Sequence, residues 1–342
     1  MRRGNTARLV AVMAVALSAC GGGGGTAESP RDAGSASRVS GSGPATVSPS
    51  TPSAPAGVEG SIDVGLAPAD VVVAFGSVWV SLHHAASVVR VDPSTHEVIA
   101  TIPVHEQPGG MGVGADAVWV MNYGDNSLTR IEPGTNDATT FPLSVQEACY
   151  APLVTPHLLL VHDCGGQVLV GVDPGTGRTI GPLPDDVQAT CGRRRGGAIA
   201  LVGNGQLVRV DARTGRVLDR KPGATVMCTD TKGVRGDQVW AGSGDDPTAV
   251  TGTVSVVSLE TGDVEQTVEV GRGPDTFAAD DAVWVRELNA HQVQRIDPAS
   301  FQVTATIPYP DEVDSGEFAV GFGAAWLADF ANDRLVRVAL PD

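Results

Sequence analysis

Four cysteines, Cys149, Cys164, Cys191 and Cys228, are the most reactive side chains in the C-terminal two thirds of the sequence. Cysteine thiols can pair as disulfides or ligate a metal ion. A metal site could use His162 and Cys164, but no Cys-x-x-Cys spacing occurs, so a metal site has less support than disulfide bonds. An even number of cysteines favours disulfide bonds in an exported chain.

Common catalytic signatures are absent from the sequence. It contains no Gly-x-Ser-x-Gly elbow, no P-loop and no His-Glu-x-x-His motif. The pairs His96-Glu97 and His105-Glu106 lack the second histidine of the metalloprotease motif. We therefore assign no catalytic residue, no metal site and no cofactor, and we leave open whether the protein is an enzyme.

A tryptophan repeat identifies the elements that must position these side chains. Every tryptophan lies in a short apolar segment that follows a Gly or Asp, and the five are Trp79, Trp119, Trp240, Trp284 and Trp326. Their spacings are 40, 121, 44 and 42 residues, so the long gap spans about three periods. Two apolar segments without tryptophan, Leu158–Val161 and Ala198–Val202, fill that gap.

Each repeat continues with further alternating segments that end in turns, as in Val88–Pro93 and Val98–Pro103. No segment shows sustained helical periodicity. Four strands in roughly 40 residues match a propeller blade. We therefore predict an all-β fold, a seven-bladed β-propeller over residues 59–342, and we expect Gly60–Gly65 to close the ring as the outer strand of the last blade.

The blade pattern also assigns places to the tryptophans and cysteines. We expect the indole rings to pack between neighbouring blades rather than to bind a ligand. Cys149 opens the innermost strand of the third blade and Cys164 ends the adjacent antiparallel strand, so we favour a Cys149–Cys164 bond. Cys191 and Cys228 open the innermost strands of consecutive blades, which fits a second bond.

The N-terminal region carries targeting features. Three arginines in the first eight residues precede the apolar run Leu9–Leu17, which is too short to span a membrane. Leu17-Ser18-Ala19-Cys20 resembles the bacterial lipobox, which implies cleavage before Cys20 and a diacylglycerol on its sulfur. We predict a lipoprotein signal peptide over residues 1–20 and a flexible Gly/Ser/Pro-rich tether over residues 21–58. The domain should then be exported and lipid-anchored at the outer face of the cell membrane, or at another envelope membrane.

The predicted propeller is acidic. Residues 59–342 contain 18 Lys and Arg against 37 Asp and Glu. Such an excess disfavours nucleic acid as a partner. Anionic lipid headgroups should also repel the domain, so the lipid on Cys20 must supply the anchor.

Two repeat segments point to a family. Val118–Asn126 and Asp92–Val104 resemble the YVTN-type propeller repeat of bacterial and archaeal surface proteins. More distantly, the sequence is similar to streptogramin (virginiamycin B) lyases, whose resemblance implies a Glu-Pro-His opening for magnesium binding and proton transfer. Here Gly273-Pro274-Asp275 stands at such an opening, without the Glu and the His, so lyase activity has little support.

One face of the predicted ring should carry the loops between the second and third strands of each blade, together with the cysteines. Loops on a rigid scaffold commonly carry binding residues. The candidate ligand residues on this face are Asn122, Tyr123, Asp125, His162, Arg286, Glu287, Asn289 and Asp329. We expect a non-enzymatic module that binds an unknown protein or small-molecule ligand through this face; the alternative is a propeller lyase or hydrolase acting on a small exported substrate.

Overall fold

The computed structural model describes residues 57–184, 187, 191–226, 232–242, 251–271, 273–278, 281–313 and 315–341. The predicted signal peptide and nearly all of the predicted tether lie outside these residues. Within the described ranges, no helix has the length and apolar character needed to cross a membrane.

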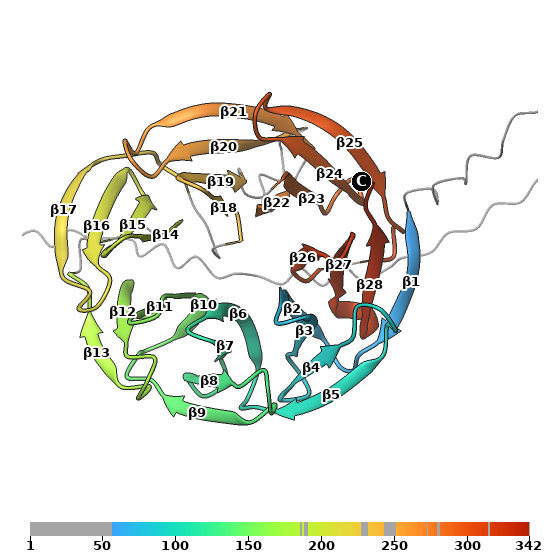
Figure 1. The fold of residues 1–342 in the computed structure, drawn as a ribbon, viewed down its shortest axis with the longest axis horizontal. Helices are drawn as coiled ribbons and strands as arrows, with labels where there is room; N and C mark the ends of the chain where they lie inside the picture. The colour runs from blue at the N-terminus through green and yellow to red at the C-terminus, as the bar shows by residue number, and fades with distance from the viewer. Residues whose placement is uncertain are drawn as a thin grey trace, which may run out of the picture. The chain divides into compact units, whose positions relative to one another are not determined.

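The described residues form seven four-stranded antiparallel sheets in a ring, as predicted (Figure 1). The only helix among them is a short 3-10 turn, Phe330–Asn332. Blade 1 consists of β2 Pro68–Ala74, β3 Ser77–Leu82, β4 Ser87–Val91 and β5 Val98–Pro103. Blade 2 consists of β6 Pro108–Gly114, β7 Ala117–Asn122, β8 Ser127–Ile131 and β9 Ala138–Pro142. Blade 3 consists of β10 Ala148–Val154, β11 Leu159–Asp163, β12 Val168–Val172 and β13 Thr179–Pro182.

Blade 4 consists of β14 Cys191–Arg195, β15 Ala198–Gly203, β16 Gln206–Asp211 and β17 Val217–Pro222. Blade 5 consists of β18 Val234–Arg235, β19 Gln238–Gly242, β20 Gly252–Ser258 and β21 Val264–Val270. Blade 6 consists of β22 Pro274–Ala278, β23 Val283–Glu287, β24 Gln292–Asp297 and β25 Gln302–Pro308. Blade 7 contains β26 Phe318–Gly321, β27 Ala324–Asp329 and β28 Arg334–Ala339, and its fourth strand is β1 Val58–Asp63. In blades 1 to 6 the first strand in chain order is the innermost in the ring, and in blade 7 the innermost strand is β26 (Figure 1).

The N-terminal strand β1 closes the ring, which confirms the sequence prediction. It pairs antiparallel with β28, with Ile62 opposite Leu335 and Asp63 opposite Arg334. In Figure 1 the blue strand β1 lies along the outer side of the red strand β28. Because β1 covers the outer edge of β28, blade 7 has the same number of strands as the others.

The tryptophans pack between blades, as expected. Trp79 of blade 1 lies in one apolar cluster with Met111, Val118 and Ile131 of blade 2. Its ring nitrogen donates a hydrogen bond to the Ala74 carbonyl, 3.0 Å away, so the buried indole keeps its polar group satisfied. Trp119 and Trp326 make the same bond to the residue five positions earlier.

Candidate functional site

An acidic residue occupies an equivalent position on, or directly before, three innermost strands. Asp70, Asp275 and Glu317 each lie two residues before the residue that pairs with the tryptophan of their blade. These residues belong to blades 1, 6 and 7, which are consecutive because the ring closes between blades 7 and 1. Equivalent positions on neighbouring innermost strands therefore bring three carboxyl groups together near the axis.

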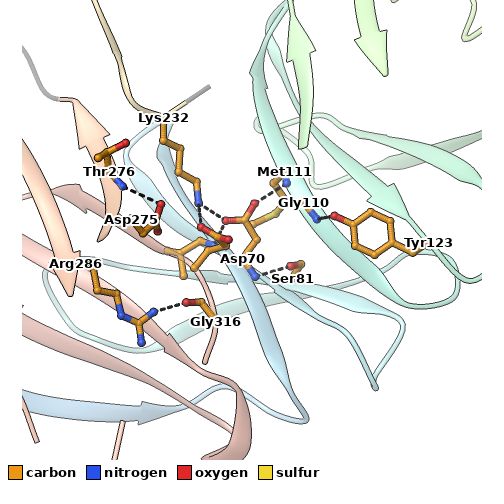
Figure 2. A network of polar contacts seen from close by, with 12 residues as sticks. Asp70, Ser81, Gly110, Met111, Tyr123, Lys232, Asp275, Thr276, Arg286 and Gly316 are labelled. Carbon is orange, nitrogen blue, oxygen red and sulfur yellow. Dashed lines mark hydrogen bonds and ion pairs between the residues drawn. The ribbon is translucent and has the colours of Figure 1, made fainter. Parts of the chain in front are cut away.

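Asp70 is the most heavily bonded of the three (Figure 2). Its side chain is 3% exposed, and its Oδ1 atom lies 2.6 Å from Nζ of Lys232. Oδ2 accepts a 2.6 Å hydrogen bond from the N–H of Met111, while the N–H of Asp70 itself donates to Ser81 Oγ. Because Lys232 precedes the innermost strand of blade 5, this ion pair joins blades that are not neighbours in the ring.

Glu317 is the second carboxylate within reach of Lys232. Its Oε2 atom lies 3.5 Å from Lys232 Nζ, and its side chain also hydrogen-bonds to Asp275. We call Asp70, Lys232, Asp275 and Glu317 the axial cluster.

Arg286 stabilises the axial cluster through the residue that precedes Glu317. This side chain is fully buried on β23 and donates Nη1–H to the carbonyl of Gly316 (Figure 2). Its Nε atom also lies 3.3 Å from the Tyr309 hydroxyl. The bond to Gly316 fixes the backbone immediately before Glu317. Arg286 therefore positions Glu317 and adds a positive charge close to it.

A cavity of about 190 Å³ opens beside the axial cluster. Asp70 and Glu317 line one part of it, and the remaining wall is formed by Ala69, Gly109, Gly110, Tyr123, Tyr150 and Ala151. The Tyr123 hydroxyl accepts a 2.7 Å hydrogen bond from the Gly110 N–H. A Cβ atom on residue 109 would lie 2.0 Å from the Tyr123 ring, so only glycine lets this ring pack against β6.

The charges of the cluster are set by burial and by Lys232. Burial raises the pKa of Asp70, although the Lys232 ammonium and the Met111 N–H oppose that rise. The pKa of Glu317 is instead lowered below its usual value. Burial alone would raise this pKa, but the Lys232 ammonium, the Asp275 hydrogen bond and the Arg286 charge outweigh it. Glu317 still keeps 39% of its side-chain surface exposed, since it faces the cavity. Burial also raises the pKa of Tyr123, which stays protonated.

The predicted Cys149–Cys164 disulfide lies on the same face as the cavity. The two Cα atoms are 6.0 Å apart, and Tyr150, which lines the cavity, follows Cys149 directly. The side chain of Cys191 and the whole of Cys228 lie outside the described residues, so the second disulfide stays a prediction. Across the described part of the chain, no group of three or more His, Cys, Asp or Glu residues could hold a metal ion.

Three predicted ligand residues occupy one repeated structural position. Asn122, Glu287 and Asp329 each stand three residues after the tryptophan of their blade and are fully buried. Asn122 donates to Ser127 and Thr129, Glu287 accepts from the Gly271 N–H and the Gln292 side chain, and Asp329 accepts from Asn332 and Arg334. Their polar atoms therefore hold the adjoining loops in place.

The other predicted ligand residues differ in their distance from the cavity. Tyr123 lines it, and His162 packs edge-on against Tyr150 with ring centroids 5.3 Å apart. Arg286 acts through Gly316, as described above. Asp125 is exposed and paired with His105 at 2.6 Å, and Asn289 is exposed on a loop after β23.

Sequence patterns do not predict the axial cluster, because they favour the loops between the second and third strands as the place of ligand binding. Asp70, Lys232 and Glu317 instead lie on or just before innermost strands, where the sequence shows only an isolated charge beside apolar residues. The one signal in the sequence is that Asp70, Asp275 and Glu317 occupy the same position relative to the tryptophan of their repeat.

No family model matches this sequence, and no curated protein matches it. Several solved structures share the fold. The chain is similar to the β-propeller domain of Cps50 (Swd1) from Myceliophteria thermophila, with a TM-score of 0.66 and 13% identity over 84% of this chain and 100% of that one. It is also similar to Kuenenia stuttgartiensis hydrazine synthase (TM-score 0.59, 11% identity, 81% and 97% covered) and to a streptogramin B lyase (TM-score 0.58, 14% identity, 82% and 97% covered). At such identities the likeness shows the propeller fold alone.

Proposed function

We propose that this protein is an exported, lipid-anchored propeller that binds a small polar ligand in the axial cavity without transforming it. The observation that carries the binding proposal is the cavity itself, which combines two carboxyl groups, two tyrosine rings and a backbone kept free of side chains at Gly109 and Gly110. Concave sites with a few convergent polar groups are the usual place of ligand recognition. A volume of about 190 Å³ suits a molecule of amino-acid size.

The rigidity of the cavity supports binding rather than a purely structural role. Much of its wall lies on the innermost strands of blades 1, 2 and 3, and the disulfide next to Tyr150 ties the third of these strands to its neighbour β11. A wall that is already ordered loses little conformational entropy when a ligand enters. The carboxyl group of Glu317, whose side chain is 39% exposed, gives the ligand a hydrogen-bond acceptor at a fixed position.

A thermal-shift screen tests the binding proposal. The chain from residue 21 to residue 342 would be heated with amino acids, amines, small sugars and divalent cations. A ligand of the cavity should raise the melting temperature of the native sequence, and Ala69→Leu, which narrows the cavity, should abolish that rise. Ala138→Leu, an equal change on the exposed outer strand β9, should leave it intact. A shift that survives in Ala69→Leu would contradict binding in the axial cavity.

The membrane anchor is tested separately at Cys20. Cys20→Ala should move the protein from the membrane fraction to the soluble fraction of the exported material, because the acyl chains supply the membrane affinity. Ser18→Ala is a suitable control, since it keeps the cysteine and a small residue before it. Unchanged membrane partitioning of Cys20→Ala would contradict the lipid anchor.

A further inference from the structure

Blade 4 has the opposite charge from the rest of the propeller. Residues Cys191–Pro222 contain eight Arg and Lys but only two Asp and Glu, a formal charge of +6. The remainder of residues 59–342 contains ten basic and 35 acidic residues, a formal charge of −25. The basic residues of blade 4 are Arg193, Arg194, Arg195, Arg209, Arg213, Arg216, Arg220 and Lys221, and we call them the blade 4 basic surface.

The blade 4 basic surface is accessible, and much of it lies away from the cavity. All of its members are exposed except Arg195, which is partly buried. Arg213 and Arg216 lie in the turn between β16 and β17, which is tied to the β14–β15 turn by a hydrogen bond from Ala212 N–H to the Gly197 carbonyl. These turns lie at the opposite end of the strands from the axial cavity, whose lining residues stand where the innermost strands begin.

Internal ion pairs neutralise only part of this surface. Arg209 forms a bidentate salt bridge with Asp219. The Nε atom of Arg195 lies 2.9 Å from Oδ1 of Asp237 in blade 5. Arg193 and Lys221 instead donate to the carbonyl oxygens of Gly236 and Glu260, which carry no formal charge. A net positive charge therefore remains on the exposed side of the blade.

We infer that blade 4 docks on the anionic lipid headgroups of the membrane to which the chain is tethered. This inference rests on the proposed lipid anchor for its location. A Gly/Ser-rich chain as long as residues 21–58 has a root-mean-square span of roughly 35 Å, so the domain stays close to the bilayer. Ionic screening over a Debye length of about 8–10 Å weakens the repulsion from the distant acidic blades but leaves the attraction of a basic surface in contact with the lipid.

This docking orients the binding site. With the β14–β15 and β16–β17 turns against the headgroups, the end of the innermost strands that carries the axial cavity points away from the lipid. A ligand or partner would then reach the cavity from the open side. The basic blade thus acts as an orienting contact, while the acyl chains supply the durable attachment.

Vesicle flotation of the unacylated chain separates this inference from the anchor. The chain from residue 21 to residue 342 retains every strand of the seven sheets but lacks Cys20 and the apolar signal segment. At low ionic strength it should float with vesicles rich in phosphatidylglycerol and not with vesicles of phosphatidylcholine alone. The double change Arg213→Gln and Arg216→Gln should weaken this partitioning roughly 30-fold, at about a factor of five for each basic residue near the surface.

A matched variant shows whether position or total charge matters. Gln266→Glu with Gln302→Glu alters the net charge by the same amount, but on exposed positions of β21 and β25, and it should retain the affinity of the native sequence. The inference would be overturned if both double variants lost vesicle binding equally. It would also be overturned if the native chain floated equally with both kinds of vesicle. Absence of flotation together with self-association that Arg213→Gln and Arg216→Gln dissolve would overturn it in favour of a second copy of the chain. None of these results depends on acylation of Cys20.

Discussion

Nζ of Lys232 lies 2.6 Å from Oδ1 of Asp70, although the two residues are 162 positions apart in the chain. Their side chains are 8% and 3% exposed, and they come from blades 5 and 1, which do not adjoin each other in the ring. The pair therefore connects the two halves of the propeller across its axis. Removing one partner of a buried ion pair leaves the other charge uncompensated, which is far more harmful than replacing both.

Lys232→Met should destabilise the domain by about 3–5 kcal/mol, because Asp70 and Glu317 then lose their shared cation. Urea denaturation followed by tryptophan fluorescence measures this loss. Adding Asp70→Asn to Lys232→Met should recover part of it, since the buried negative charge is removed as well. Equal stability of Lys232→Met and the native sequence would contradict a stabilising axial cluster.

Replacing both cysteines of the disulfide with serine should lower the free energy of unfolding by about 3 kcal/mol, the amount that chain-entropy models give for a closed loop of 15 residues. The comparison is made by urea denaturation without reductant. Adding reductant should destabilise the native sequence at least as much as the double substitution does. If the native sequence denatures identically with and without reductant, no stabilising disulfide is present.

Deleting residues 58–63 should expose the edge of β28 and open the ring. The five paired positions between β1 and β28 suggest a loss of roughly 3–5 kcal/mol, at about 1 kcal/mol for each hydrogen bond and its packing. The exposed edge should also promote aggregation, which light scattering detects. Deleting residues 31–36 of the predicted tether is the control and should change neither quantity. A neutral deletion of β1 would show that closure does not stabilise the fold.

The stability of the domain should decrease as the pH falls below 6.5. Burial lowers the pKa of His162 from 6.5 to about 4, so between these values the unfolded chain binds a proton that the folded chain does not. This single group should reduce stability by up to about 3 kcal/mol between pH 7 and pH 4. Partial burial lowers the pKa of His83 in the same direction.

Melting temperatures measured across this pH range test the assignment. His162→Phe should flatten part of the pH dependence and leave the contribution of His83. His157→Phe, at an exposed position, should keep the full slope of the native sequence. Identical slopes for His162→Phe and the native sequence would show that His162 is not the group responsible.

The sequence alone was sufficient for the architecture, because each blade is encoded locally. The number of repeated strand segments predicted seven blades, alternating apolar residues predicted the strands, and the segment around Ile62 predicted closure; the structure confirms all three. The Cys149–Cys164 pair could be predicted for the same reason, since adjacent antiparallel strands bring their ends together. Periodicity and turn chemistry act over a few residues and need no knowledge of distant contacts.

The axial cluster was decided by tertiary structure. Asp70, Lys232, Asp275 and Glu317 come from four blades, and only the radius and closure of the ring determine that their side chains meet. The same applies to the surroundings of Asn122, Glu287 and Asp329, because only the folded chain shows that these candidate ligand residues are buried and hydrogen-bonded to nearby residues. The same polar side chain can hydrogen-bond to a ligand or to the polar groups of its own loop, and only its surroundings in the folded chain distinguish the two roles.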